Sequence, residues 1–129
     1  MRCTDDELAA IAEAEELTLA SLRADGTLRR PVTMWVIRDG GDLYVRSVNG
    51  REAAWFRGAQ TRHQARIRAG GVEKDVSLAE TGEAGEQIDA AYEAKYGTRY
   101  PTIVPSIVAP QARAATLKLV PQDTTTTEI

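Results

Sequence analysis

The sequence is poor in the residues that most often bind metals. Among its 129 residues there are one cysteine, Cys3, and one histidine, His63. A single cysteine cannot form an intrachain disulfide and gives no basis for a zinc site built on cysteines. A single histidine excludes a histidine-rich metal site. No nucleophile-elbow pattern surrounds any serine, so a serine–histidine–aspartate triad lacks support. We expect His63 to be solvated at the start of a strand.

Long apolar runs and a basic net charge are also missing. No run approaches the roughly 20 residues that cross a bilayer, and the first residues lack the apolar core of a signal peptide. The formal net charge is -3, so no overall basic field attracts nucleic acid. Neither a G-x-x-x-x-G-K loop nor a G-x-G-x-x-G fingerprint occurs. These absences predict a cytoplasmic location and argue against nucleic-acid and membrane partners.

The composition that remains is ordinary for a globular protein, with 43% hydrophobic and 27% charged residues. The length suits one domain, which we place at residues 1–121, followed by a flexible polar tail at residues 122–129. Arginine outnumbers lysine 13 to 3. Arginine suits bidentate contacts with anions, although a GC-rich genome explains the excess equally well.

Hydrophobic periodicity predicts three helices and six strands. A capping box from Thr4 to Glu7 begins the first helix, and Gly97 in a left-handed conformation ends the third. Asp89 and Glu93 are expected on the solvent face of that third helix. Residues 98–113, with three prolines, are expected to be irregular. The helices are expected at residues 4–14, 52–60 and 83–96, and the strands at residues 17–22, 28–37, 43–48, 65–69, 72–78 and 114–120.

Two glycine turns predict β-hairpins, at Asp39-Gly40-Gly41-Asp42 and at Gly70-Gly71. The segment 28–37 is the most hydrophobic and is apolar on both faces, so it needs cover on both sides. We therefore expect it to run through the middle of a barrel or to be covered by a second subunit. Mostly antiparallel strands in meander order close into a small barrel, because closure removes exposed edges.

A polar corner, Ser47-Val48-Asn49-Gly50-Arg51, joins a predicted strand to a predicted helix. The first amides of a helix lack internal partners and attract phosphate, and the arginine fork fits a phosphate. The alternative is plain capping by Asn49, with Glu52 three positions later as in a capping box. Trp55 follows about one helical turn later, and Trp35 lies on the neighbouring strand. Both interpretations stay open, and core packing is the simpler role for each tryptophan.

The run VTMWVIRDGGDLYVRSVNGREAAWFRGA, residues 32–59, resembles the flavin-binding split barrels, which are pyridoxamine-phosphate-oxidase-like proteins. It is most similar to the deazaflavin-dependent nitroreductase group. In that group one strand ends before a D-G turn, the next ends in a Ser-x-Gly-Gly corner, and a helix with a tryptophan follows. Here the corner is Ser47-Val48-Asn49-Gly50 and the tryptophan is Trp55. The likeness continues over most of the chain and is nearer still to a small uncharacterised subfamily.

The resemblance implies an α+β, mainly β, fold: a six-stranded antiparallel split β-barrel with three flanking helices. It also implies a homodimer with the cofactor at or near the subunit interface. Tyr100 is the implied proton donor, with Tyr96 beside it on the substrate side. The implied cofactor-binding residues are Ser47, Asn49, Gly50 and Arg51 for the phosphate, Met34 and Trp35 for the ring, Arg30 for its polar edge, and Trp55 for the tail or the pocket mouth.

The chain departs from the group at two basic positions. Val48 stands where the group has a basic residue, and the basic stretch before the second strand is reduced to Arg29-Arg30. FMN, a deazaflavin of the F420 type and no cofactor therefore all stay open. The leading function is an oxidoreductase that passes a hydride to a small unsaturated or nitro-bearing substrate. The alternatives are a cofactor-free split barrel that performs a non-redox reaction or binds a ligand, and a dimeric interaction module.

Overall fold

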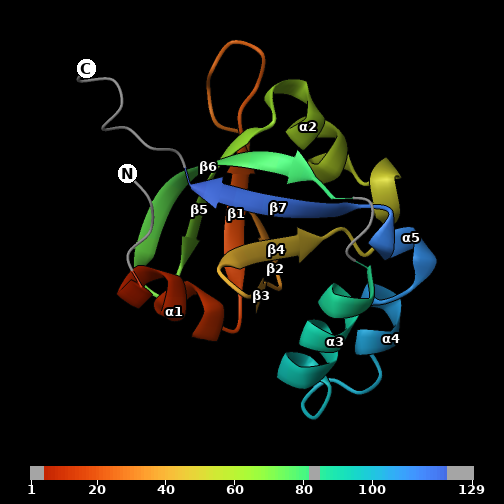
Figure 1. The fold of residues 1–129 in the computed structure, drawn as a ribbon. Helices are drawn as coiled ribbons and strands as arrows, with labels where there is room; N and C mark the ends of the chain where they lie inside the picture. Colours follow the sequence, from red (N-terminus) through yellow and green to blue (C-terminus); the bar gives the residue numbers. More distant parts are fainter. Residues whose placement is uncertain (1–4, 82–84, 122–129) are drawn as a thin grey trace.

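Figure 1 shows the computed structural model of the protein, which describes residues 5–81 and 85–121. One antiparallel sheet curls into a half-barrel in the order β2-β1-β5-β6-β7-β4-β3. Its strands are β1 (Leu17–Ser21), β2 (Val32–Met34), β3 (Ile37–Asp39), β4 (Asp42–Arg46), β5 (Gln64–Ala69), β6 (Val72–Glu80) and β7 (Thr116–Pro121). The helices are α1 (Asp5–Glu13), a 3₁₀ turn η1 (Gly50–Glu52), α2 (Ala54–Arg62), α3 (Gly85–Tyr96), α4 (Val104–Ile107) and α5 (Pro110–Arg113).

The sheet has seven strands rather than six because the predicted strand 28–37 breaks in two. Its first part, β2, pairs only with β1, and its second part, β3, pairs only with β4. These two short strands are the opposite edges of the sheet, and only Trp35 and Val36 separate them in sequence. The prediction of a central strand is therefore wrong. One bent segment instead supplies both edges and brings the ends of the curled sheet together.

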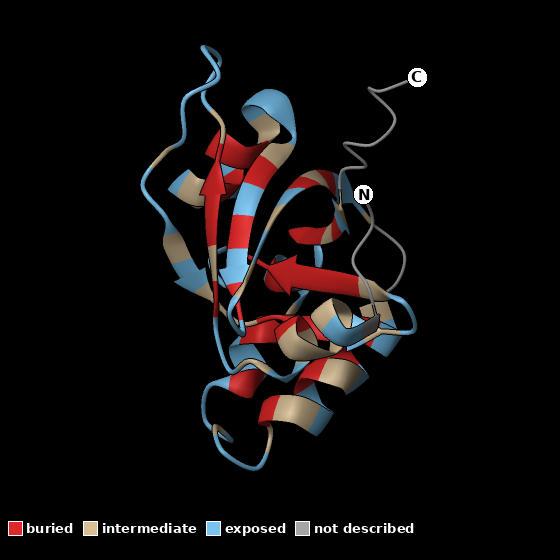
Figure 2. Cartoon of the chain, turned by 90° about the vertical axis from the view of Figure 1, so that its left-hand side faces the viewer, coloured by how far each residue is buried: buried red, intermediate tan, exposed pale blue. Residues whose placement is uncertain are grey.

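Two clusters of buried side chains hold the fold together. The larger fills the curl of the sheet, and the alternation predicted for β5 is confirmed: Ala65, Ile67 and Ala69 are buried while Arg66 and Arg68 are exposed (Figure 2). Leu117 and Leu119 of β7 point into the same cluster, as predicted. The smaller cluster packs α3 and α4 against β3 and β4. Its buried members are Ile37, Tyr44, Ile88, Tyr92, Tyr96, Val104 and Ile107.

Both predicted hairpin turns are confirmed, between β3 and β4 and between β5 and β6. Gly70 and Gly71 have φ values of 58° and 81°, a left-handed conformation that glycine adopts without strain. Gly70 also permits a close approach, because a Cβ atom there would lie 2.3 Å from the carbonyl oxygen of Ala10 in α1. The turn therefore fixes both the register of the hairpin and the position of α1.

Several predicted boundaries differ from the observed ones. The predicted helix at residues 52–60 is instead the turn η1 followed by α2, and the irregular segment 98–113 contains α4 and α5. Gly97 does not adopt the left-handed conformation expected of it; its amide continues the helical pattern by donating to the carbonyl oxygen of Glu93, 2.9 Å away. His63 ends α2 with a φ of 55° and is exposed. The Thr4 capping box, the start of the third predicted helix and the tail at residues 122–129 lie outside the described residues.

Across the described part of the chain, none of the helices combines the length and apolar character that a transmembrane segment requires.

Candidate functional site

A cleft of about 340 Å³ lies between the two ends of the curled sheet. One side comes from Glu16 and the β2 segment, and the other from the residues that end β4. The full lining is Glu16, Val32, Thr33, Met34, Trp35, Arg46, Ser47, Val48, Asn49, Trp55, Ile103 and Ile107. Hollows of similar volume occur beside β7 and beside the loop that follows β1. This cleft differs from them because both tryptophans and a buried, unpaired hydroxyl group lie on it.

Trp35 forms the aromatic wall of the cleft. Its ring stacks on that of Tyr96, with centroids 4.1 Å apart and planes 5° from parallel, and it lies 5.2 Å from the ring of Tyr100. Since Tyr96 covers one face of the indole, the cleft meets the part of Trp35 that Tyr96 leaves open. Planar aromatic groups pack well against such a surface. Met34 and Trp55 extend the same apolar lining.

The two tyrosines predicted to be catalytic lie on the far side of Trp35 and do not line the cleft. Tyr96 is 1% exposed, and its hydroxyl accepts a hydrogen bond from the amide of Val36, 3.2 Å away. Burial raises the pKa of Tyr96 to about 12. The hydroxyl of Tyr100 donates to the carboxylate of Glu15, and this bond raises the pKa of Tyr100. Their catalytic role stays a prediction.

Ser47 is the buried polar anchor of the cleft. It is 1% exposed, and its Oγ has no hydrogen-bond partner among the described residues. An unpaired buried hydroxyl is costly, so its presence on the cleft calls for an explanation. Asn49 makes no side-chain capping bond within the described chain, so the corner is not closed by plain Asn49 capping.

The conformation of the corner depends on Gly50. It has a φ of 78°, and a Cβ atom there would lie 2.6 Å from the side chain of Gln111 in α5. Gln111 donates in turn from Nε2 to the carbonyl oxygen of Val48, 3.2 Å away. The position therefore requires glycine on two grounds, its backbone conformation and the close approach of α5.

The predicted cationic residues do not line the cleft. Arg51 donates to the carboxylate of Glu80 at 2.7 Å and to the carbonyl oxygen of Ala114 at 3.1 Å. Arg30 is exposed. Of the predicted cofactor-binding residues, the structure therefore brings together Met34, Trp35, Ser47, Asn49 and Trp55 on the cleft, with Gly50 next to them.

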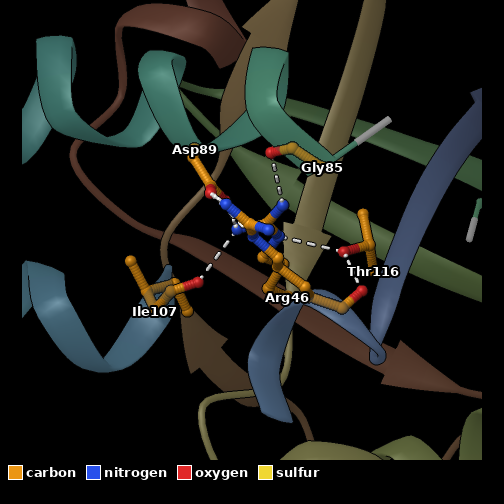
Figure 3. Close-up of polar contacts among 6 residues, drawn as sticks. Arg46, Gly85, Asp89, Ile107 and Thr116 are labelled. Carbon is orange, nitrogen blue, oxygen red and sulfur yellow. Dashed lines mark hydrogen bonds and ion pairs between the residues drawn. The ribbon is translucent and has the colours of Figure 1, made fainter. Parts of the chain in front are cut away.

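Arg46 is a lining residue that the sequence analysis did not identify (Figure 3). Its side chain is fully buried. Its Nε donates to Thr116 Oγ1 at 2.9 Å, and its Nη atoms donate to Asp89 and to the carbonyl oxygens of Ile107, at 3.0 Å, and Gly85, at 3.2 Å. These bonds tie the cleft floor to α3, α4 and β7.

Asp89 was expected on the solvent face of its helix, and this prediction is wrong. The residue is 9% exposed and binds both Arg46 and Arg113, the latter from Nε at 2.7 Å. Burial by itself raises the pKa of its carboxyl group, but the hydrogen bonds from the two guanidinium groups outweigh it and the net pKa is lowered. The sequence did contain a signal for this burial. Tyr92 and Tyr96 lie three and seven positions after Asp89, and this spacing places the acid on the apolar stripe of the helix.

Comparison with known proteins identifies a family and a shared fold. Residues 7–119 match the family described as "Uncharacterized protein conserved in bacteria (DUF2255)". A comparison with curated proteins finds no match.

Three solved structures illustrate the shared fold. The haem storage protein HutZ from Vibrio cholerae has a TM-score of 0.64 at 16% identity, covering 95% of this chain and 92% of that one. A protein provisionally named a pyridoxamine 5′-phosphate oxidase, from Listeria innocua, has a TM-score of 0.61 at 18% identity, covering 92% and 93%. An F420-H2 dependent reductase has a TM-score of 0.56 at 13% identity, covering 82% and 93%. They confirm the resemblance to the pyridoxamine-phosphate-oxidase-like split barrels; a shared fold does not by itself give a function.

Proposed function

We propose that this chain, which belongs to the DUF2255 family of uncharacterized bacterial proteins, binds a planar cofactor of the flavin or deazaflavin type in the cleft and acts as an oxidoreductase. One observation carries the proposal: Trp35, which forms an aromatic wall, and Ser47, whose hydroxyl is buried and unpaired among the described residues, line the same cleft. The flat ring of the cofactor packs against Trp35, and an oxygen atom of the cofactor accepts a hydrogen bond from the hydroxyl of Ser47.

The lining fits the ring of such a cofactor. Trp35 and Met34 provide an apolar wall, and Trp55 and Ile107 add apolar surface. About 340 Å³ lies at the small end of the range for ligand pockets. The ring and the first part of a tail therefore fill the cleft, and the rest of the tail runs along the exposed rim at Val48 and Asn49.

Each part of the chain has a separate task in this proposal. A reduced flavin or deazaflavin supplies a hydride to a small unsaturated or nitro-bearing substrate. Trp35 orients the ring, Ser47 and Asn49 hold a polar group of the tail, and the apolar lining excludes water, which strengthens polar contacts inside the cleft. The proton that completes the reduction comes from solvent or from a side chain.

The comparisons support this proposal without deciding between cofactors. One neighbour is an F420-H2 dependent reductase, whereas another is a haem storage protein. Histidine is a common haem ligand, and the one histidine of this sequence, His63, ends α2 and does not line the cleft. A flavin-type cofactor therefore fits the described lining better than haem. The homodimer and the cytoplasmic location stay predictions.

Titration with FMN, riboflavin and F420 tests the proposal. We expect saturable quenching of cofactor fluorescence by the wild type. Val48→Trp, at the exposed rim of the cleft, should abolish the quenching. Val120→Trp is the matched control, because Val120 is similarly exposed, 39% against 43%, but lies away from the cleft. Quenching by none of the three cofactors contradicts the proposal. Oxidation of the bound reduced cofactor by a nitroaromatic compound then tests hydride transfer.

A second candidate function is favoured by the state of the arginines. Arg51 is paired with Glu80, and the guanidinium of Arg46 is bonded to Asp89 and to three neutral oxygens. Among the described residues that line the cleft, no cationic side chain is therefore available to bind a phosphate. A cofactor-free split barrel would instead bind a neutral aromatic ligand for a non-redox reaction. Thermal stabilisation by neutral aromatic compounds, with no binding of FMN or F420, is the expected sign of this function.

A further inference from the structure

Glu16 is an acidic side chain on the cleft that makes no hydrogen bond or ion pair with the described residues. It lies directly before β1, whose register places Leu17 opposite Met34, so Glu16 comes next to Trp35. Its neighbour Glu15 points to other partners, Arg99 and Tyr100. Glu16 is exposed and lines the same cleft as Trp35. It is therefore free to meet a ligand.

Ser47 lines the same cleft. It follows the end of β4, whereas Glu16 precedes the start of β1, and these strands lie at opposite ends of the curled sheet. The side of Ser47 carries a buried hydroxyl donor, and Arg46 precedes it at the end of β4. The side of Glu16 carries a carboxylate, which only accepts hydrogen bonds. The cleft thus offers a donor at one end and a negatively charged acceptor at the other.

We infer that Glu16 determines the orientation and the selectivity of the cleft, by accepting a hydrogen bond from an N–H group on the edge of the bound ring. The inference rests on the proposed function. The ligand it selects is a planar heterocycle with an unsubstituted imide or amide N–H at one edge and a polar, acceptor-bearing tail at the other. The N–H edge points to Glu16 and the tail points to Ser47.

The physical basis is the strength and exclusivity of a charge-assisted hydrogen bond. A hydrogen bond to a carboxylate is stronger than one between neutral groups. A site built around such a bond discriminates against an analogue that lacks the donor, because the charge is then desolvated without a partner. For a carboxylate that the ring covers only in part, the expected discrimination is about tenfold or more in Kd.

The experiment compares riboflavin with 3-methylriboflavin, in which a methyl group replaces the imide hydrogen. Fluorescence titration gives the Kd of each for four proteins: the wild type, Glu16→Ala, Glu16→Gln and Glu13→Ala. Glu13 is the matched control, because it is exposed in α1 and does not line the cleft. We expect the wild type and Glu13→Ala to prefer riboflavin by about tenfold or more. Glu16→Ala should bind both equally, and Glu16→Gln should keep part of the preference through its amide oxygen.

The outcomes separate the inference from the proposed function. If the wild type binds both flavins with equal Kd, the inference is overturned while the proposed function stands. A preference that survives in Glu16→Ala overturns it as well, because the methyl group is then rejected by shape at another residue. Binding of neither flavin by the wild type overturns the inference, and the proposed function is overturned with it only if FMN and F420 are not bound either. Since Glu16 and Glu13 are both exposed, their substitution leaves the fold intact, which circular dichroism verifies.

Discussion

The hydroxyl of Tyr96 lies within hydrogen-bonding distance of both backbone polar atoms of Val36, 3.2 Å from its nitrogen and 3.0 Å from its oxygen. Val36 is fully buried in the break between β2 and β3, where strand pairing stops. The same hydroxyl lies 2.8 Å from the carbonyl oxygen of Glu15, and Lys95 donates to the oxygen of Val36 at 2.6 Å. Side chains of α3 thus replace the missing strand partner at the bend behind the cleft.

Tyr96→Phe should therefore destabilise the protein rather than only affect catalysis. The substitution leaves the buried amide of Val36 without its acceptor, whereas Lys95 still satisfies the carbonyl oxygen. An unpaired buried donor costs about 1–3 kcal/mol, and urea unfolding measures the loss. Tyr100→Phe is the control, because within the described part of the chain its exposed hydroxyl binds only the side chain of Glu15, and little change is expected. Equal stability of wild type and Tyr96→Phe would remove the proposed support of the bend.

Ser47→Ala should have opposite effects on stability and on ligand binding. Without ligand, the change removes an unpaired buried hydroxyl, and the free energy of unfolding should rise by up to about 1–3 kcal/mol. With ligand, the donor is lost and the Kd for riboflavin should increase severalfold. Ser106→Ala, at an exposed serine of α4, should change neither the stability nor the Kd. A destabilised Ser47→Ala protein with unchanged affinity would show that the hydroxyl serves the fold alone.

Asp89 should link stability to acid pH. Because its pKa in the folded protein is lowered from the ordinary value of 3.8, the contribution of its carboxylate is fully present above about pH 4. It is lost as the pH falls through the lowered folded pKa. Urea unfolding between pH 7 and pH 2 should show this loss in the wild type and a flatter acid limb in Asp89→Asn.

Asp89→Asn should also be less stable at pH 7, by about 3 kcal/mol, because the buried Arg46 loses its counter-charge. Glu93→Gln on the exposed face of the same helix is the control and should stay within about 0.5 kcal/mol of the wild type. Identical acid limbs for wild type and Asp89→Asn would show that other carboxyl groups control acid unfolding.

Glu80→Gln tests whether Arg51 can serve a phosphate. The pKa of Glu80 is lowered by its hydrogen bonds from Arg51 and Gln60, so the pair is formed at neutral pH. Removing the charge of Glu80 frees Arg51 for another anion. If the cofactor phosphate uses Arg51, affinity for FMN should increase severalfold while affinity for riboflavin stays constant. Glu73→Gln, which removes the ion pair of Arg68 instead, is the control. An unchanged ratio of the two Kd values would exclude Arg51 as a phosphate ligand.

Local sequence signals predicted the local structure well. The glycines in the turns at residues 39–42 and 70–71 indicate the turn conformation directly, so both hairpins could be placed from sequence alone. The curled antiparallel sheet was also accessible, through the strand pattern and the resemblance of residues 32–59. The break between β2 and β3, at Trp35 and Val36, could not be predicted from the sequence. An apolar segment has the same sequence pattern whether it pairs with one set of strands or with two.

The candidate site was predicted in part for a similar reason. Ser47, Trp35 and Trp55 stand out in sequence because a corner or a large aromatic ring is a local feature. Glu16 and Arg46 reach the cleft only because the sheet curls, and isolated charged residues give no such signal. Asp89 was misplaced because its burial depends on the pairing with Arg46, which is a contact 43 residues away in sequence.

The place of β7 in the sheet has a consequence for folding during synthesis. β7 lies between β6 and β4, so without it the strands form two separate groups, β2-β1-β5-β6 and β4-β3. A nascent chain can therefore assemble the first group before residues 116–121 have left the ribosome, but it cannot join the second. Because such distant pairings form slowly, the side of the molecule that carries the cleft is completed only after translation has passed β7.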